Sequence, residues 1–143
     1  VDQEREVERY RYKVEAGANF AVTQPIFDPE ALERFLERVG SGSIPMIAGI
    51  WPFLSLRNAE FLAHEVPGVV VPDAIVERMR GAQESGPEAA LEEGVLIALE
   101  MIEAVRPHVQ GYHLSAPSRR VDVALRVLRE AGVSARLAGA GSP

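Results

Sequence analysis

The stretch KVEAGANFAVTQPIFD, residues 13–28, contains the end of a helix, a strand, a loop and the start of a second helix. The first helix is predicted over residues 2–16, and Gly17 follows where a left-handed residue would end it. Residues 19–23 are few and mostly apolar, as expected of a parallel strand that is covered on both faces. Asp28 and the proline after it are typical of a helix start.

The same alternation of strand and helix continues along the chain. Further strands are predicted at residues 44–50 and 109–114, because both runs are short and rich in apolar residues. The remaining helices are predicted from their apolar stripes and start signals at residues 28–39, 55–66, 72–80 and 87–105, with a last one from Ser118 or Arg119 to Gly132. Gly94, inside the longest helix, predicts close packing there.

Strands separated by helices predict an α/β fold with parallel strands and right-handed crossovers. Three strands cannot close a barrel, and a full (β/α)₈ barrel needs roughly 250 residues. We therefore weigh a small open sheet against the second half of a TIM barrel. A first helix with no strand before it, and two sheet edges without cover, favour the half barrel. Residues 1–136 are predicted to form this half barrel, and residues 137–143 a flexible tail.

Composition is that of one globular domain, with 47% hydrophobic and 25% charged residues. No apolar run is long enough for a membrane span and no signal peptide is visible, so we expect a cytoplasmic protein without a membrane partner. The net charge of −6 gives no reason to expect nucleic acid. The absence of cysteine excludes disulfides, thiolate metal sites and cysteine nucleophiles.

Ligands of parallel α/β proteins bind beyond the carboxyl ends of the strands, so the loops there carry the candidate residues. Gln24 offers one acceptor and two donors, which suits the edge of a pterin or another heterocycle. It could equally bond to nearby backbone. Trp51 and Phe53 flank a proline after the second strand, where they could stack on a flat ring or simply cover the core.

Two other features point to anions or to surface charge. Arg119 and Arg120 lie at a predicted helix start, where an anion would be favoured, although exposed arginines also serve solubility. Lys13, Arg9 and Glu6 share one helical face, the usual pattern of a solvated row of ion pairs. The histidines lack the spacing of metal ligands, and no motif of a Ser/His/Asp triad occurs, so we expect no metal site.

Residues 13–28 resemble the K-V-[DE]-A-G-A-[ND]-x-x-[IV]-T-Q-x-x-[FY]-D signature of methylenetetrahydrofolate reductases. Residues 44–52, IPMIAGIWP, resemble the strand and loop that follow in that family, and Val71-Pro72 its next helix start. The runs SLRNAEFL at residues 55–62 and EVPGV at 65–69 look most like the reductase half of bifunctional homocysteine methyltransferase/reductase proteins. The resemblance covers nearly the whole chain.

This resemblance implies a (β/α)₈ barrel that carries FAD, takes hydride from NADH or NADPH and passes it to methylenetetrahydrofolate, giving methyltetrahydrofolate for methionine synthesis. Gln24 would hold the pterin edge, Leu56 stands where some relatives place a phenylalanine near substrate, and Arg119 would lie near the folate tail or the nicotinamide cofactor. Lys13, Arg9 and Glu6 would contact FAD.

The family's proton donor and its aspartate near the flavin have no counterpart in this segment, so we expect no catalytic residue here and no turnover by the chain alone. The N-terminal half of the same barrel is the expected partner, and a homo-oligomer is possible. Two alternatives stay open: a non-catalytic split-barrel fragment or subunit-interaction domain, and a folate-linked methyltransferase barrel. A missing zinc-thiolate set weighs against homocysteine chemistry in this segment.

Overall fold

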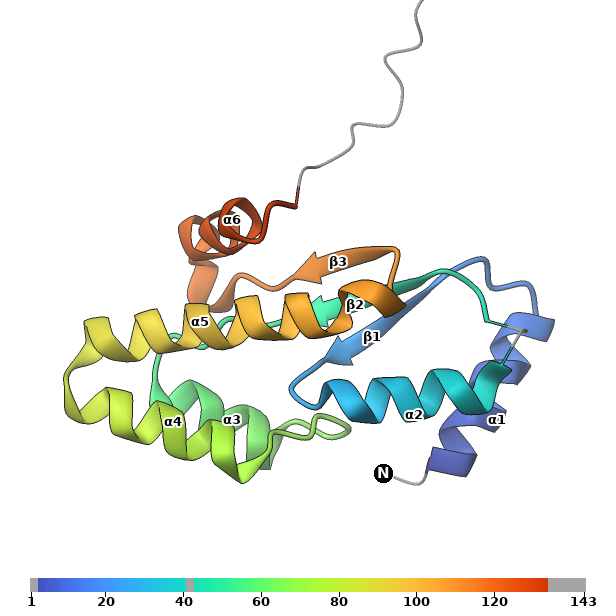
Figure 1. The fold of residues 1–143 in the computed structure, drawn as a ribbon. Coiled ribbons are helices and arrows are strands. Elements are labelled where there is room, and N and C mark those ends of the chain that lie inside the picture. Colours follow the sequence, from blue (N-terminus) through green and yellow to red (C-terminus); the bar gives the residue numbers. More distant parts are fainter. Residues whose placement is uncertain (1–2, 41–42, 134–143) are drawn as a thin grey trace, which may run out of the picture.

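The computed structural model describes residues 3–40 and 43–133, so the predicted tail and the domain boundary at residue 136 lie outside the described residues. Its centre is a sheet of three parallel strands in the order β1-β2-β3 (Figure 1). The strands are β1 (Ala21–Pro25), β2 (Met46–Ile50) and β3 (Gly111–Leu114). The α/β fold with an open, partial barrel is confirmed, and which half of a barrel it represents stays a prediction.

Six α-helices accompany the sheet within the described residues. They are α1 (Gln3–Glu15), α2 (Pro29–Val39), α3 (Leu56–Glu65), α4 (Asp73–Glu84), α5 (Pro87–Val105) and α6 (Val121–Glu130). Two predicted start signals are confirmed: the Asp28 side chain accepts the Ala31 N–H at 3.1 Å, and Ser55 accepts the Asn58 N–H at 3.3 Å. These bonds satisfy amides that the first turn of a helix leaves free.

The end of the chain differs from the sequence prediction of a helix that starts at Ser118 or Arg119. Residues Pro117–Arg119 form a short 3₁₀ turn instead, and α6 begins at Val121. Ser118 and Arg119 have φ values of 51° and 62°, a left-handed conformation that a right-handed helix cannot contain. The prediction was wrong because the serine resembled a helix cap but is used to turn the chain.

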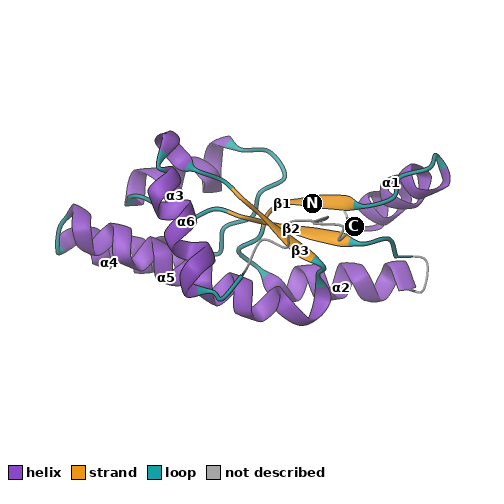
Figure 2. Ribbon diagram, turned by 90° about the horizontal axis from the view of Figure 1, so that it is seen from above, coloured by secondary structure: helices purple, strands orange, loops and turns teal. Residues whose placement is uncertain are grey.

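Only one face of the sheet is covered in the described structure. Ala48 and Ile50 of β2 pack against α2, α5 and α6 in a core to which Val95, Ile102 and Val127 also belong. Figure 2 shows α2 and α5 running along this side of the strands. Gly94 of α5 lies so close to the loop after β2 that a Cβ atom would overlap the Phe53 carbonyl oxygen, so the predicted close packing is confirmed.

The opposite face of the sheet carries exposed side chains. Val22 of β1 is 50% exposed and Phe20, just before the strand, is 59% exposed. Gln24, two residues further along β1, is exposed as well, and helices cover the other face of the sheet, so both residues belong to the open face. In a closed barrel this face would line the interior.

Different helices lie at the two ends of the strands. Both ribbon views place α3 and α4 beyond the arrowheads of the strands and α1 at the other end (Figures 1 and 2). The contacts agree, because Val7 and Tyr10 of α1 pack with Val39 at the end of α2 and Met46 at the start of β2. The Tyr10 hydroxyl accepts the Ile44 N–H at 2.8 Å.

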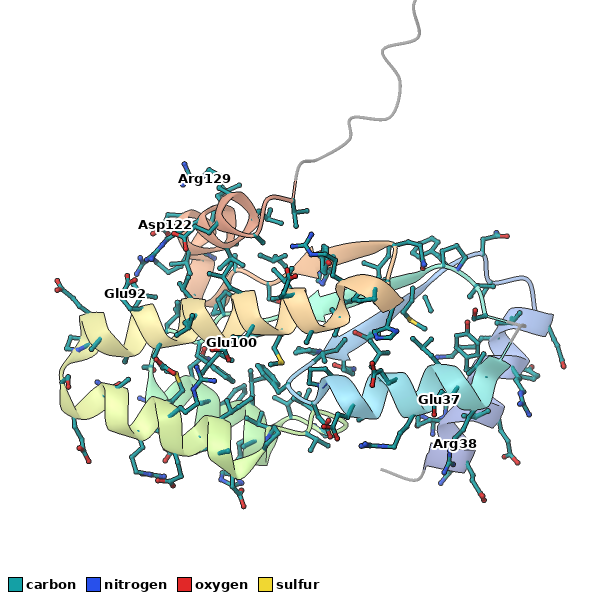
Figure 3. The ribbon with its side chains drawn as sticks, in the orientation of Figure 1. Glu37, Arg38, Glu92, Glu100, Asp122 and Arg129 are labelled. Atoms are coloured by element: carbon teal, nitrogen blue, oxygen red, sulfur yellow. The ribbon has the colours of Figure 1, made fainter. Side chains whose placement is uncertain are left out.

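Ion pairs connect the helices on the outer surface. Glu100 of α5 binds Arg78 of α4 through two hydrogen bonds of 2.6 and 2.9 Å, and Glu92 binds Arg126 of α6 at 2.7 Å. Figure 3 shows Glu92 on the α6 side of α5 and Glu100 on the α4 side. These two pairs tie α5 to the helices on either side of it.

Candidate functional site at the carboxyl edge of the sheet

Gln24 lies inside β1, at an irregularity in the strand, rather than in a loop as the sequence suggested. Val22 pairs with Ile47 and Pro25 with Gly49, so β1 has one more residue between these pairs than β2. Such a bulge bends a strand and redirects a side chain, and bulges are frequent beside active sites. The Gln24 side chain is exposed, and its amide makes no hydrogen bond within residues 3–40 and 43–133. In the described residues, the Gln24 side chain therefore does not make the hydrogen bond to nearby backbone that was the alternative.

Thr23 holds the bulge in place. Its hydroxyl accepts the Gly49 N–H at 2.9 Å and donates to the Gln24 carbonyl at 2.7 Å. The side chain thus completes a hydrogen bond that the irregular pairing of the backbone would leave unmade. This contact fixes the backbone of Gln24 relative to the central strand.

Gly49 is required at the centre of this edge. A Cβ atom there would lie 2.7 Å from the Thr23 carbonyl oxygen and 2.9 Å from that of Gln24, both of which belong to backbone. Because backbone atoms cannot move aside cheaply, β1 can approach β2 this closely only at a glycine. The central strand therefore carries no side chain next to Gln24.

His113 also lies at this edge of the sheet. From the sequence, only a role as a metal ligand had been considered for it. It pairs with Gly49 in the β2–β3 register. Its neighbours Tyr112 and Leu114 pack against the helical core, the Tyr112 hydroxyl donates to the Ile102 carbonyl at 3.4 Å, and burial raises the Tyr112 pKa. Strand alternation then turns the exposed His113 to the same open face as Gln24. The alternation of apolar and polar residues in this strand is the signal that could have revealed it.

The loop after β2 is partly buried and is held by contacts with Phe27 and Asn58. Phe53 is fully buried and stacks on Phe27, with ring centroids 4.7 Å apart, so the core alternative holds for Phe53. Asn58 accepts hydrogen bonds from Trp51 Nε1 at 3.2 Å and from the Leu54 N–H at 3.4 Å. The loops after β1 and β2 are therefore joined to each other by the ring stack.

The other predicted substrate residues have different surroundings. Leu56 is partly buried and packs against the core of α3, α4 and α5, while its N–H donates to Gln83 Oε1 at 3.3 Å. Arg119 is exposed in the turn after β3, at the same edge of the sheet as Gln24. Its neighbour Arg120 binds Asp122 at 2.7 Å. Arg119 is thus the member of the arginine pair that is available to an anion.

The three predicted cofactor residues lie on α1, away from Gln24. Arg9 pairs with Glu6 at 3.1 Å, as the ion-pair interpretation of this face predicts, and both side chains are exposed. Lys13 is exposed in the last turn of the helix. Because α1 packs at the start of the strands, the structure brings Gln24 and Arg119 to one edge and leaves Lys13, Arg9 and Glu6 at the other (Figure 1).

Two further features of the described part of the chain concern metal ions and membranes. Across residues 3–40 and 43–133, no group of three histidine, aspartate or glutamate side chains is placed to hold a metal ion. None of the helices described there has the length and apolar character needed to cross a bilayer.

Comparison with known proteins identifies the family of the chain. The family model described as methylenetetrahydrofolate reductase matches residues 1–132. Methylenetetrahydrofolate reductase 2 of Schizosaccharomyces pombe is 31% identical over 131 residues, which cover 85% of this chain and 20% of that protein. The 5,10-methylenetetrahydrofolate reductase of Escherichia coli is 32% identical over 110 residues, which cover 75% of this chain and 36% of the relative. The chain therefore spans well under half the length of these relatives.

A solved structure shares the fold at low sequence identity. It is an uncharacterized protein from Clostridium thermocellum, described as binding two copies of 5-methyl-5,6,7,8-tetrahydrofolic acid. The match has a TM-score of 0.59 and 17% identity, and covers 90% of this chain and 50% of that one. The family match extends over almost the whole chain, and the chain belongs to the methylenetetrahydrofolate reductase family.

Proposed function

We propose that the chain is the folate- and flavin-binding second half of an FAD-dependent methylenetetrahydrofolate reductase. The reaction passes hydride from NADH or NADPH through flavin to methylenetetrahydrofolate, and the product methyltetrahydrofolate serves methionine synthesis. The observation that carries the proposal is the exposed amide of Gln24 at the bulge of β1. Family membership and a structural neighbour described as binding methyltetrahydrofolate support it.

The pterin ring would bind beside Gln24. The amide supplies a carbonyl acceptor and two N–H donors, which match adjacent donor and acceptor atoms on the edge of a pterin. Arg119, exposed at the same edge, would bind an anionic group such as the carboxylates of the folate tail. Leu56 contributes indirectly, because its packing supports the start of α3 after the β2 loop.

FAD would bind through α1. Arg9 and Lys13 are exposed cations on this helix, and Arg9 is paired with Glu6. These residues lie at the start of the strands, away from Gln24, so they would contact the phosphate end of FAD while its ring reached the folate beside Gln24. When bound, the flavin supplies the hydride chemistry. The residues of this chain would anchor and orient it, and they would position the folate.

The rest of the barrel would come from its N-terminal half. The exposed Phe20 and Val22 and the outer edges of β1 and β3 need neighbours if the open face is to become a barrel interior. That half would also supply the proton donor, so the chain alone is expected not to turn over. A homo-oligomer of completed barrels is compatible with this arrangement, and the cytoplasm is the proposed location.

The test compares two activities of the chain co-expressed with the N-terminal half. NAD(P)H–menadione oxidoreduction reports flavin reduction alone, whereas NAD(P)H–methylenetetrahydrofolate oxidoreduction also requires the folate. Gln24→Leu, of similar size but without the amide, should reduce the second activity at least tenfold and leave the first unchanged, because only the pterin contacts are lost.

Other results would favour the alternatives. Loss of both activities in Gln24→Leu, with intact flavin absorbance, would contradict a specific folate role for the amide. Folate binding with no flavin absorbance in the assembled barrel would favour a folate-linked methyltransferase. Absence of both ligands would favour a non-catalytic fragment or subunit-interaction domain.

A further inference from the structure

The residue opposite Gln24 across the central strand is His113. Gly49 pairs with His113 on one side, and on the other its Cβ position lies against the carbonyl of Gln24. Neighbouring strands are about 4.8 Å apart, so β1 and β3 lie about 10 Å apart with a residue without a side chain between them. Gln24 and His113 are therefore exposed on the two outer strands, and the backbone of Thr23 and Gln24 occupies the place of a side chain at Gly49 between them.

The chemistry of His113 suits a polar heterocycle. A neutral imidazole has one donor and one acceptor nitrogen, so it can bind a ring nitrogen, a carbonyl or an amino group. The histidine is exposed on the open face, whereas His108, the histidine just before β3, pairs with Glu33 at 2.7 Å. Within the described residues the imidazole of His113 makes no hydrogen bond or ion pair.

We infer that His113 is a second binding residue for the flat, nitrogen-rich ring whose other edge Gln24 holds. The ring lies on the open face between the two side chains, and Gln24 and His113 contact it from opposite strands. The inference rests on the proposed folate function, and assigns to the site a residue and a ligand position that this function does not require.

The experiment measures binding of methyltetrahydrofolate to the full chain by NMR, which detects affinities down to the millimolar range. Variants are His113→Ala, Gln24→Ala and the double variant, with His64→Ala as the matched control because His64 is also exposed but lies on α3. Thermal unfolding of each variant checks the fold, and an exposed histidine should leave the midpoint unchanged.

His113→Ala is expected to weaken binding about three- to tenfold, the range of one lost hydrogen bond, while His64→Ala has no effect. The single-variant losses in His113 and Gln24 should not add in the double variant, because both residues hold one ring. The His113 ring signals of the unsubstituted chain should shift during the titration.

Two outcomes overturn the inference in different ways. If the unsubstituted chain binds and Gln24→Ala weakens binding but His113→Ala does not, the folate function stands and the role of His113 is refuted. If the unsubstituted chain shows no saturable shifts, the proposed folate function fails and the role of His113 fails with it.

Discussion

The hydroxyl of Thr23 accepts the backbone N–H of Gly49 at 2.9 Å, across the bulge between β1 and β2. The same hydroxyl donates to the Gln24 carbonyl, so one side chain links the central strand to the residue proposed to bind pterin. The bulge is therefore a fixed structure rather than a loose strand end.

Replacing Thr23 by valine keeps the shape of the side chain and removes its hydroxyl. The Gly49 N–H then loses its acceptor, which should lower the free energy of unfolding by about 1–3 kcal/mol. Urea unfolding measures this loss, and amide hydrogen exchange should show faster exchange at Gly49. Thr23→Ser retains the hydroxyl and should stay near the original value; equal losses in both variants would refute the role of the hydrogen bond.

Gly94 and Gly81 provide a matched pair of helical glycines. A Cβ atom at Gly94 would overlap the Phe53 carbonyl, whereas one at Gly81 in α4 meets nothing within 4 Å. Gly94→Ala should therefore lower the free energy of unfolding by about 1–3 kcal/mol, the usual cost of overpacking. Gly81→Ala should stabilise it by about 0.5–1 kcal/mol through helix propensity. Thermal unfolding distinguishes them, and a stable Gly94→Ala would contradict the close contact.

The order of strands and helices could be predicted from the sequence because each element has its own period and its own start signals. Asp28 and Ser55 cap their helices as predicted, and the close packing at Gly94 was anticipated from a glycine inside an apolar helix. These features depend on interactions within a few residues, or on a single missing side chain.

The structural features that could not be predicted from the sequence depend on tertiary contacts. The Gln-Pro pair at the end of β1 resembles a loop, and the strand continues through it because Thr23 bonds to Gly49 on the next strand. The position of Arg119 depends on a left-handed turn at Ser118, and a serine in the sequence does not predict such a turn. The placement of α1 away from Gln24 depends on packing against α2 and β2.

Arg78 links α4 to α5 through Glu93 at 2.7 Å and Glu100 at 2.6 Å. Its hydrogen bonds hold the pKa of Glu100 below the ordinary value. A carboxylate whose pKa is lowered by folding stabilises the protein above its unfolded pKa, and this contribution disappears as pH falls through the folded pKa. Arg78→Met should thus lower the unfolding free energy by about 1 kcal/mol at neutral pH, a value kept small by solvent exposure.

The pH dependence of this loss is the check. The difference between Arg78→Met and the original chain, measured by urea unfolding, should shrink as the pH falls through the lowered pKa of Glu100, below the ordinary range of a glutamate. Arg57→Met, a change at an exposed arginine on α3, is the control and should have little effect at either pH. A constant difference across this range would show that the ion pairs do not contribute.

Ser118 occupies the left-handed region with φ 51°, which costs a residue with a Cβ about 1 kcal/mol. Ser118→Gly should recover about 0.5–1 kcal/mol of stability, measured by thermal unfolding. Ser85→Gly is the control, since Ser85 has φ −85° and should gain nothing. A loss of stability in Ser118→Gly would contradict the turn described before α6.

The position of bound folate tests the account most directly, through a crystal structure of the chain with methyltetrahydrofolate. The pterin ring should lie between Gln24 and His113, with the Gln24 amide about 3 Å from its edge. A pterin seated instead in the groove between α5 and α6, lined by Glu92 and Arg126, would contradict it. So would a Gln24 amide turned into the helical layer.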